Sequence, residues 1–253
     1  MNNMFGDNFF SNLLHTPFSQ LQDMQPTMQQ QEESFTVYDF SAPSIRQAEV
    51  LTLDSRIDDE SRIIFNTYEA ILKQVFTHDM DSPNITSLQV AKSTYDFSLL
   101  IAQLSRIWEL ELNNSVVQIV RLINGIEMPQ YYQRVKTDRN QKAEDVIVKV
   151  GDISINLNDW VEDKRLKPQM MGHICILLQM FRNPISDYLG VSVENFKSFI
   201  KKIEIIKQYR NKASHTSVLE EDDFHVFYET FCFLLREKWL TILMHGKDRV
   251  RAI

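Results

Sequence analysis

No proline occurs between residues 185 and 253 of this chain, and apolar residues recur there at helical spacing. The same spacing, with apolar side chains at i, i+4, i+7 and i+8, begins near residue 56. The whole sequence of 253 residues contains only six glycines and seven prolines, the residues that most often make turns. These patterns predict an all-α fold and disfavour β-sandwiches, β-propellers and enzymes with glycine-rich phosphate loops.

Glycines and prolines divide the periodic region into segments. We predict helices over 58–78, 86–124, 169–182 (closed by Pro184), 192–214 and 219–245. The second is unusually long, and we expect a break near Ser93 to Tyr95 or at Asn113 and Asn114, because such side chains compete for backbone hydrogen bonds. Two alternating runs flank Gly151 and Asp152 and predict a β-hairpin at about 145–158. The expected architecture is a bundle of about five helices with one inserted hairpin.

The N-terminal region differs from the rest of the chain in charge and composition. Residues 1–60 contain ten acidic side chains and two basic ones, a net charge of −8, so the other 193 residues carry +1 of the total of −7. Residues 1–45 are rich in Asn, Gln, Met, Ser and Phe and have no helical or strand period. We therefore predict a disordered or weakly ordered acidic leader over 1–50, followed by a helical domain over 51–253.

The leader carries more large apolar residues than disordered tails usually do. Two interpretations remain open, a docking element for a regulatory protein partner and a tail that packs weakly on its own domain. The residues concerned are Phe5, Phe9, Phe10, Leu13, Leu14 and Phe18. The nearly neutral body does not exclude RNA or DNA as a partner.

Several functional classes lack their sequence signals. Cys175 and Cys232 lie in apolar helical segments without Cys/His clusters, so we expect reduced core residues and no zinc site. No signal peptide or membrane span is expected, which predicts a cytoplasmic protein without membrane contact. The patterns GxSxG, GxxxxGK[ST], GxGxxG and HExxH are all absent, and with them the support for most enzyme classes.

One segment with reactive side chains remains, Arg210-Asn211-Lys212-Ala213-Ser214-His215, between the last two predicted helices. Residues 197–215 contain a single acidic side chain, Glu204, and a cluster of basic ones that would attract RNA phosphates. As RNA-binding residues we predict Lys201, Lys202, Lys207 and Lys212.

This Arg-Asn-x3-His arrangement resembles the motif of the HEPN superfamily (higher eukaryotes and prokaryotes nucleotide-binding domain). The resemblance covers about residues 85–245 as architecture and rests in detail on RNKASH, residues 210–215. It implies a metal-independent endoribonuclease without a cofactor, whose active site forms between two copies of the motif in a homodimer. Such proteins commonly act in bacterial toxin, antiviral defence or RNA-processing systems. Arg210 and His215 match the catalytic pair, and Asn211 matches the polar residue that often follows the arginine.

The implied chemistry suits these residue types. Attack of an RNA 2′-hydroxyl on its own phosphate requires proton transfer at neutral pH, and an imidazole with an ordinary pKa of about 6.5 can provide it. A guanidinium can bind two of the phosphate oxygens as negative charge develops on them. The expected products carry a 2′,3′-cyclic phosphate and a 5′-hydroxyl. Glu109 or Glu111 on the long predicted helix would orient Arg210 or His215, unless that face is solvated.

Other interpretations of the same residues remain open. Arg210 and Lys212 would also complement the negative end of a helix dipole, with His215 capping the helix. A non-catalytic HEPN-like dimeric module that docks a partner through the leader is the main alternative, and a DNA-binding regulator using helix 192–214 is a poorer one. An extended RNA path is predicted over Arg121, Arg134, Lys136, Arg139 and Lys142.

Overall fold

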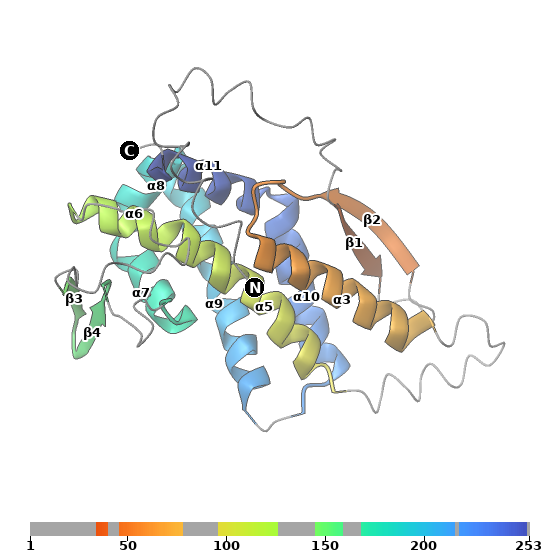
Figure 1. Cartoon of the computed structure of the whole chain (residues 1–253). Coiled ribbons are helices and arrows are strands. Elements are labelled where there is room, and N and C mark those ends of the chain that lie inside the picture. The colour runs from red at the N-terminus through yellow and green to blue at the C-terminus, as the bar shows by residue number, and fades with distance from the viewer. Residues whose placement is uncertain are drawn as a thin grey trace, which may run out of the picture. The chain divides into compact units, whose positions relative to one another are not determined.

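A computed structural model describes residues 34–39, 46–77, 96–125, 145–158, 168–215 and 218–251 (Figure 1). All of them belong to one compact unit that begins at Glu33. Helices predominate in these residues, as the all-α prediction requires, and two short antiparallel hairpins accompany them. The helices are α3 (Asp59–Thr77), α5 (Ser98–Asn114), α6 (Val116–Ile123), α7 (Met171–Met180), α8 (Arg182–Leu189), α9 (Val193–Ser214), α10 (Glu221–Arg236) and α11 (Trp239–Arg251).

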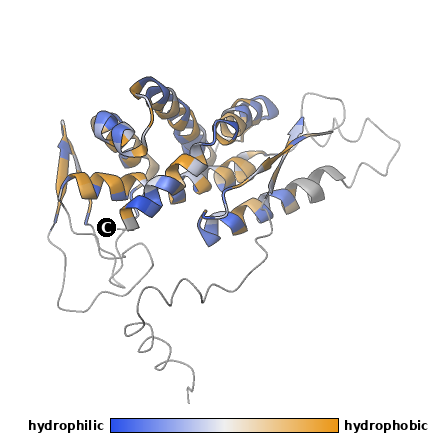
Figure 2. Ribbon diagram, turned by 90° about the horizontal axis from the view of Figure 1, so that it is seen from above, coloured by the Kyte–Doolittle hydropathy of each residue, from blue (hydrophilic) through white to orange (hydrophobic). Residues whose placement is uncertain are grey.

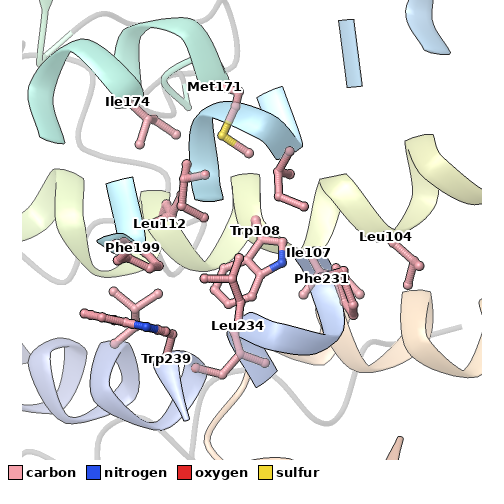
Figure 3. Close-up of a cluster of buried hydrophobic side chains, with 14 of the residues drawn as sticks. Leu104, Ile107, Trp108, Leu112, Met171, Ile174, Phe199, Phe231, Leu234 and Trp239 are labelled. Atoms are coloured by element: carbon pink, nitrogen blue, oxygen red, sulfur yellow. The ribbon is translucent and has the colours of Figure 1, made fainter. Parts of the chain in front are cut away.

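Helix α5 lies between α3 and α9 and carries the centre of the core (Figure 1). Its Trp108 is fully buried and makes edge contacts with the rings of Phe199 and Phe231, at centroid distances of 6.3 and 6.1 Å (Figure 3). Trp239 of α11 stacks on Phe199 at 4.2 Å. Each helix carries both hydrophobic and hydrophilic residues (Figure 2), as expected for amphipathic helices that pack around a shared core.

The long predicted helix is broken at the two asparagines, as expected, because α5 ends at Asn114 and Ser115 separates it from α6. The alternative break, near Ser93 to Tyr95, lies outside the described residues. Ser115 has φ −123° and ψ −75°, outside the helical range, and its hydroxyl donates to the carbonyl of Glu111 at 2.6 Å. Helix α6 continues beyond the break in a new direction (Figure 1). The predicted helices 58–78 and 192–214 match α3 and α9 to within a residue at the ends that are described.

The prediction of one final helix over 219–245 is wrong. Helix α10 ends at Arg236, and Lys238 adopts a left-handed φ of 57° before α11 begins. No glycine or proline marks this turn, so the apolar periodicity gives no local signal of it. Similarly, Pro184 does not close the helix before it. It occupies the first turn of α8, where a proline costs no helical hydrogen bond.

The first strand and most of the second lie within the segment predicted as a leader. Strands β1 (Ser34–Asp39) and β2 (Arg46–Thr52) pair antiparallel, and Phe35 of β1 is fully buried. Its ring packs against Phe65 and Tyr68 of α3 and Phe231 of α10. The folded domain therefore begins before the predicted boundary at residue 51. The sequence pattern missed this strand because only two of its residues, Phe35 and Val37, are buried, and the rings that cover Phe35 are distant in sequence. Residues 1–33 lie outside the described residues.

The second hairpin confirms its prediction. Strands β3 (Ile147–Val150) and β4 (Ile153–Asn156) pair antiparallel around Gly151, whose φ of +57° suits a tight hairpin turn. Val148 and Ile155 are opposite each other and buried. One face of the hairpin therefore belongs to the hydrophobic core, whereas Ile147 and Ile153 on the other face are exposed.

Both cysteines are buried and unpaired, as predicted. Burial raises the pKa of the Cys175 thiol to about 11 and that of Cys232 to about 12. Among the described residues, no helix combines the length and the apolar character that crossing a membrane requires.

Candidate functional site

Helix α9 determines where the Arg-Asn-x3-His motif lies. Its first turn is capped by Ser192, whose hydroxyl accepts a hydrogen bond from the amide of Asn195 at 3.2 Å. One face of α9 is buried against α5, α7, α8 and α10 through Phe196, Phe199, Ile200, Ile203 and Ile206. The helix ends at Ser214, and His215 follows in an extended conformation, its amide bonded to the carbonyl of Lys212. The motif thus spans the last turn of α9 and the residue after it.

Arg210 continues the buried stripe of α9, because it lies four residues after Ile206. Its side chain is 34% exposed, and its Nη2 lies 3.4 Å from Oε2 of Glu109 on α5. The Glu109 side chain is 20% exposed. The structure therefore brings together Arg210 and one of the two carboxylates that the sequence proposed as its partner.

His215 and Asn211 face solvent. Both residues are exposed, and within the described part of the chain the His215 imidazole has no hydrogen bond, ion pair or ring contact. The Ser214 hydroxyl, by contrast, is turned back onto its own helix and donates to the carbonyl of Arg210 at 2.9 Å. His215 is thus a solvent-exposed histidine directly after the last turn of α9.

The four lysines predicted to bind RNA have different surroundings. Nζ of Lys212 donates to Oδ1 of Asp223 at 3.1 Å and lies 4.7 Å from the centre of the Tyr209 ring. The hydrogen bond with Asp223 raises the pKa of Lys212. Lys202 lies over the ring of Phe233. Lys201 is exposed with no such contact among the described residues, and Lys207 is half-buried.

Glu111 does not take part in this site, contrary to the prediction. It is fully buried, and its Oε1 accepts a hydrogen bond from the amide of Asp58 at 2.7 Å. Burial raises its pKa, although Lys247 opposes the shift. The reason is geometric: residues two apart on a helix point in directions that differ by about 200°. Glu109 faces α9, so Glu111 faces α11 and the connection between β2 and α3.

Arg121 does not extend an RNA path either. It is 2% exposed, and its guanidinium donates to Oδ1 of Asn158. The first residues of α6 are buried around its whole circumference, which places Arg121 inside the protein. The other four basic residues of the predicted path, Arg134, Lys136, Arg139 and Lys142, lie outside the described residues.

Two polar residues near the site were not predicted as functional. Asn113, expected only as a helix breaker, and Gln169 are both buried and bonded to each other. Asn and Gln side chains in helical segments are usually exposed to solvent. The sequence signal for the burial of these two was therefore limited to the apolar residues near them. In the regions that the structure describes, no group of three or more His, Cys, Asp or Glu side chains is arranged to hold a metal ion.

Comparisons of the chain with protein-family models, with curated proteins and with solved structures gave no match.

Proposed function

We propose that this protein is a metal-independent endoribonuclease of the HEPN type, with His215 and Arg210 as its catalytic residues. The observation that carries the proposal is the exposed His215 imidazole, which has no partner among the described residues and follows the helix turn that holds a half-exposed Arg210. The mostly helical architecture is compatible with a HEPN-like bundle. From the resemblance we further propose a cytoplasmic homodimer that acts in bacterial defence or as a toxin.

In the proposed reaction, one His215 of the homodimer accepts the proton of the RNA 2′-hydroxyl, and the other donates a proton to the leaving 5′-oxygen. Arg210 binds the phosphate oxygens as they gain negative charge. The 2′-oxygen forms a bond to phosphorus while the bond to the 5′-oxygen breaks, which leaves a 2′,3′-cyclic phosphate. The exposed Asn211 amide is a further donor to the same phosphate. Because Glu109 already contacts Arg210, the phosphate has to share the guanidinium with this carboxylate or displace it.

The test is RNA cleavage in the presence of EDTA. Wild type is incubated with total tRNA and with a mixed-sequence single-stranded RNA, beside His215→Ala, Arg210→Ala and the control His225→Ala, a half-buried histidine on α10. Cleavage by wild type and the control alone, with cyclic-phosphate ends, supports the proposal. Equal cleavage by His215→Ala, or a strict requirement for a divalent metal, rejects it.

A second candidate function is a non-catalytic HEPN-like interaction module. One observation favours it: Arg210 and Lys212 are already paired with Glu109 and Asp223, so the positive charge at the end of α9 is partly neutralised. This alternative predicts that His215→Ala leaves the biological effect of the protein intact. It also predicts that deletion of residues 1–45 abolishes that effect.

A further inference from the structure

A chain of hydrogen bonds joins the β3–β4 hairpin to the guanidinium of Arg210. It runs through the segment that precedes α7 and through one turn of α5. These links are not required for the helices themselves, which have their own backbone hydrogen bonds. The hydrogen bonds instead fix the positions of the β3–β4 hairpin, the segment before α7 and helix α5 relative to one another.

The first link is the carboxylate of Glu109, which is shared between two partners. Its Oε2 contacts Nη2 of Arg210 at 3.4 Å, and its Oε1 accepts a hydrogen bond from the amide of Met171 at 3.1 Å. Met171 is the first residue of α7. Since both oxygens belong to one rigid carboxylate, a displacement of the α7 N-terminus reorients the oxygen that faces Arg210.

The second link fixes the segment before α7. The side-chain Nδ2 of Asn113 donates to the backbone carbonyl of Gln169 at 2.9 Å, and the backbone amide of Gln169 donates to Oδ1 of Asn113 at 2.8 Å. Asn113 also donates to the carbonyl of Glu109 at 2.8 Å. Asn113 and Gln169 are 2% and 6% exposed, so loss of one partner leaves a buried polar group unsatisfied. These hydrogen bonds therefore fix the backbone of Gln169 beside Asn113 on α5.

The third link reaches the hairpin. Nε2 of Gln169 donates to the carbonyl of Asn156, the last residue of β4, at 2.8 Å. The Asn156 side chain in turn accepts from the amides of Val146 and Asn158, so the base of the hairpin is itself fixed. Oε1 of Gln169 has a separate partner in Nδ1 of His173 at 3.3 Å. Only the Nε2 side of this amide leads to the hairpin.

We propose that the β3–β4 hairpin is a positioning element for Arg210, and that Gln169 and Asn113 are the positioning residues that connect them. A ligand or protein that moves the hairpin would alter the contact between Glu109 and Arg210 and thereby control the site. The consequence for RNA cleavage rests on the proposed function, but the mechanical connection does not.

The test compares a variant of Gln169 with a variant of His173, the residue that contacts the side-chain oxygen of Gln169. Gln169→Met keeps the side-chain volume but removes the hydrogen bond to the hairpin, whereas His173→Ala removes only the contact on the other side. Three quantities are measured in the full chain: the NMR signal of the Arg210 guanidinium, hydrogen exchange of the Met171 amide, and the cleavage rate at saturating RNA.

For Gln169→Met we expect a shifted Arg210 signal, at least about tenfold faster exchange at Met171, and a cleavage rate reduced about 10- to 100-fold with unchanged RNA affinity. His173→Ala is expected to resemble wild type in all three. Amides in the middle of α9 report global stability and should exchange at similar rates in both variants.

A Gln169→Met protein with wild-type Arg210 and Met171 signals overturns the inference, because the hairpin would then be disconnected without effect on the site. If wild type does not cleave RNA, the proposed function fails, while the two NMR measurements still decide the positioning role.

Discussion

Nζ of Lys247 lies 3.7 Å from Oε2 of Glu111, and their side chains are only 3% and 0% exposed. Lys247 also donates to the carbonyl of Arg56 at 2.7 Å, and Glu111 accepts from the amide of Asp58. The pair thus ties α11 and α5 to the connection between β2 and α3. A buried ion pair adds little net stability compared with apolar residues, but removal of one partner leaves the other charge buried and uncompensated.

We therefore expect Lys247→Met to lower the free energy of unfolding by about 3–5 kcal/mol. The double variant Lys247→Met/Glu111→Gln should be less destabilised than the single one, because its remaining polar group is neutral. Urea unfolding followed by circular dichroism measures both. A cost below about 1 kcal/mol for Lys247→Met would mean that the two charges do not compensate each other in solution.

Local patterns allowed much of this fold to be predicted. Helices α3 and α9 and the hairpin around Gly151 each have an internal period and their own turn or cap residues. The turn at Lys238 has no such signal, because lysine does not itself favour the left-handed φ that it adopts there. Strand β1 likewise depends on distant contacts, such as the hydrogen bond from the Tyr38 amide to the hydroxyl of Tyr228.

The candidate site divides in the same way. The motif itself, Arg210 to His215, can be read from consecutive residues. The consecutive residues do not show which cations are free to bind RNA, because the partner of Lys212 is Asp223, on the following helix. The choice between Glu109 and Glu111 depends on the rotation of α5 about its own axis, which the pattern of apolar residues left undecided because large apolar side chains flank both.

Two glycines are predicted to respond in opposite ways to alanine. Gly172 lies in the first turn of α7, and an added Cβ meets no atom within 4 Å. Gly172→Ala should raise stability by about 0.5–1 kcal/mol, since alanine loses less backbone entropy. Gly190 ends α8 with a φ of +71°, and Gly190→Ala should cost about 1–2 kcal/mol. Thermal unfolding measures both, and equal shifts would contradict the assigned backbone conformations.

Asp96 links the start of α5 to the start of α10, and its contribution should depend on pH. Its Oδ1 accepts hydrogen bonds from the hydroxyl and amide of Ser98 and from the amide of Leu219. These bonds, that of the Ser98 hydroxyl foremost, lower the pKa of Asp96 below its ordinary value of 3.8. The stabilisation is therefore complete above pH 3.8 and is lost as the pH falls through the lower pKa of the folded state.

We expect Asp96→Asn to lower the free energy of unfolding at pH 7, because hydrogen bonds to a charged acceptor are stronger than those to a neutral one. The loss should be below about 1 kcal/mol, since solvent screens this exposed carboxylate. The difference from wild type should shrink between pH 3.8 and the lower pKa of folded Asp96, because over this range the carboxyl of the unfolded chain binds a proton before that of the folded protein. Urea midpoints of both proteins at pH 7, 4 and 2.5 give the comparison. A difference that stays constant with pH would show that the charge of Asp96 contributes nothing.

The lysines of α9 should differ in their contribution to RNA binding. Lys201 is exposed with no ion pair among the described residues, so Lys201→Ala should weaken RNA binding. The slope of log K against log salt should fall by about 0.7, which is the contribution of one phosphate contact on a single strand. Lys212 is bonded to Asp223, and the double variant Lys212→Ala/Asp223→Asn keeps the net charge. Its slope should equal that of wild type. Fluorescence anisotropy with a labelled single-stranded RNA at several salt concentrations measures these slopes, and an equal reduction in both proteins would mean that RNA displaces Asp223 from Lys212.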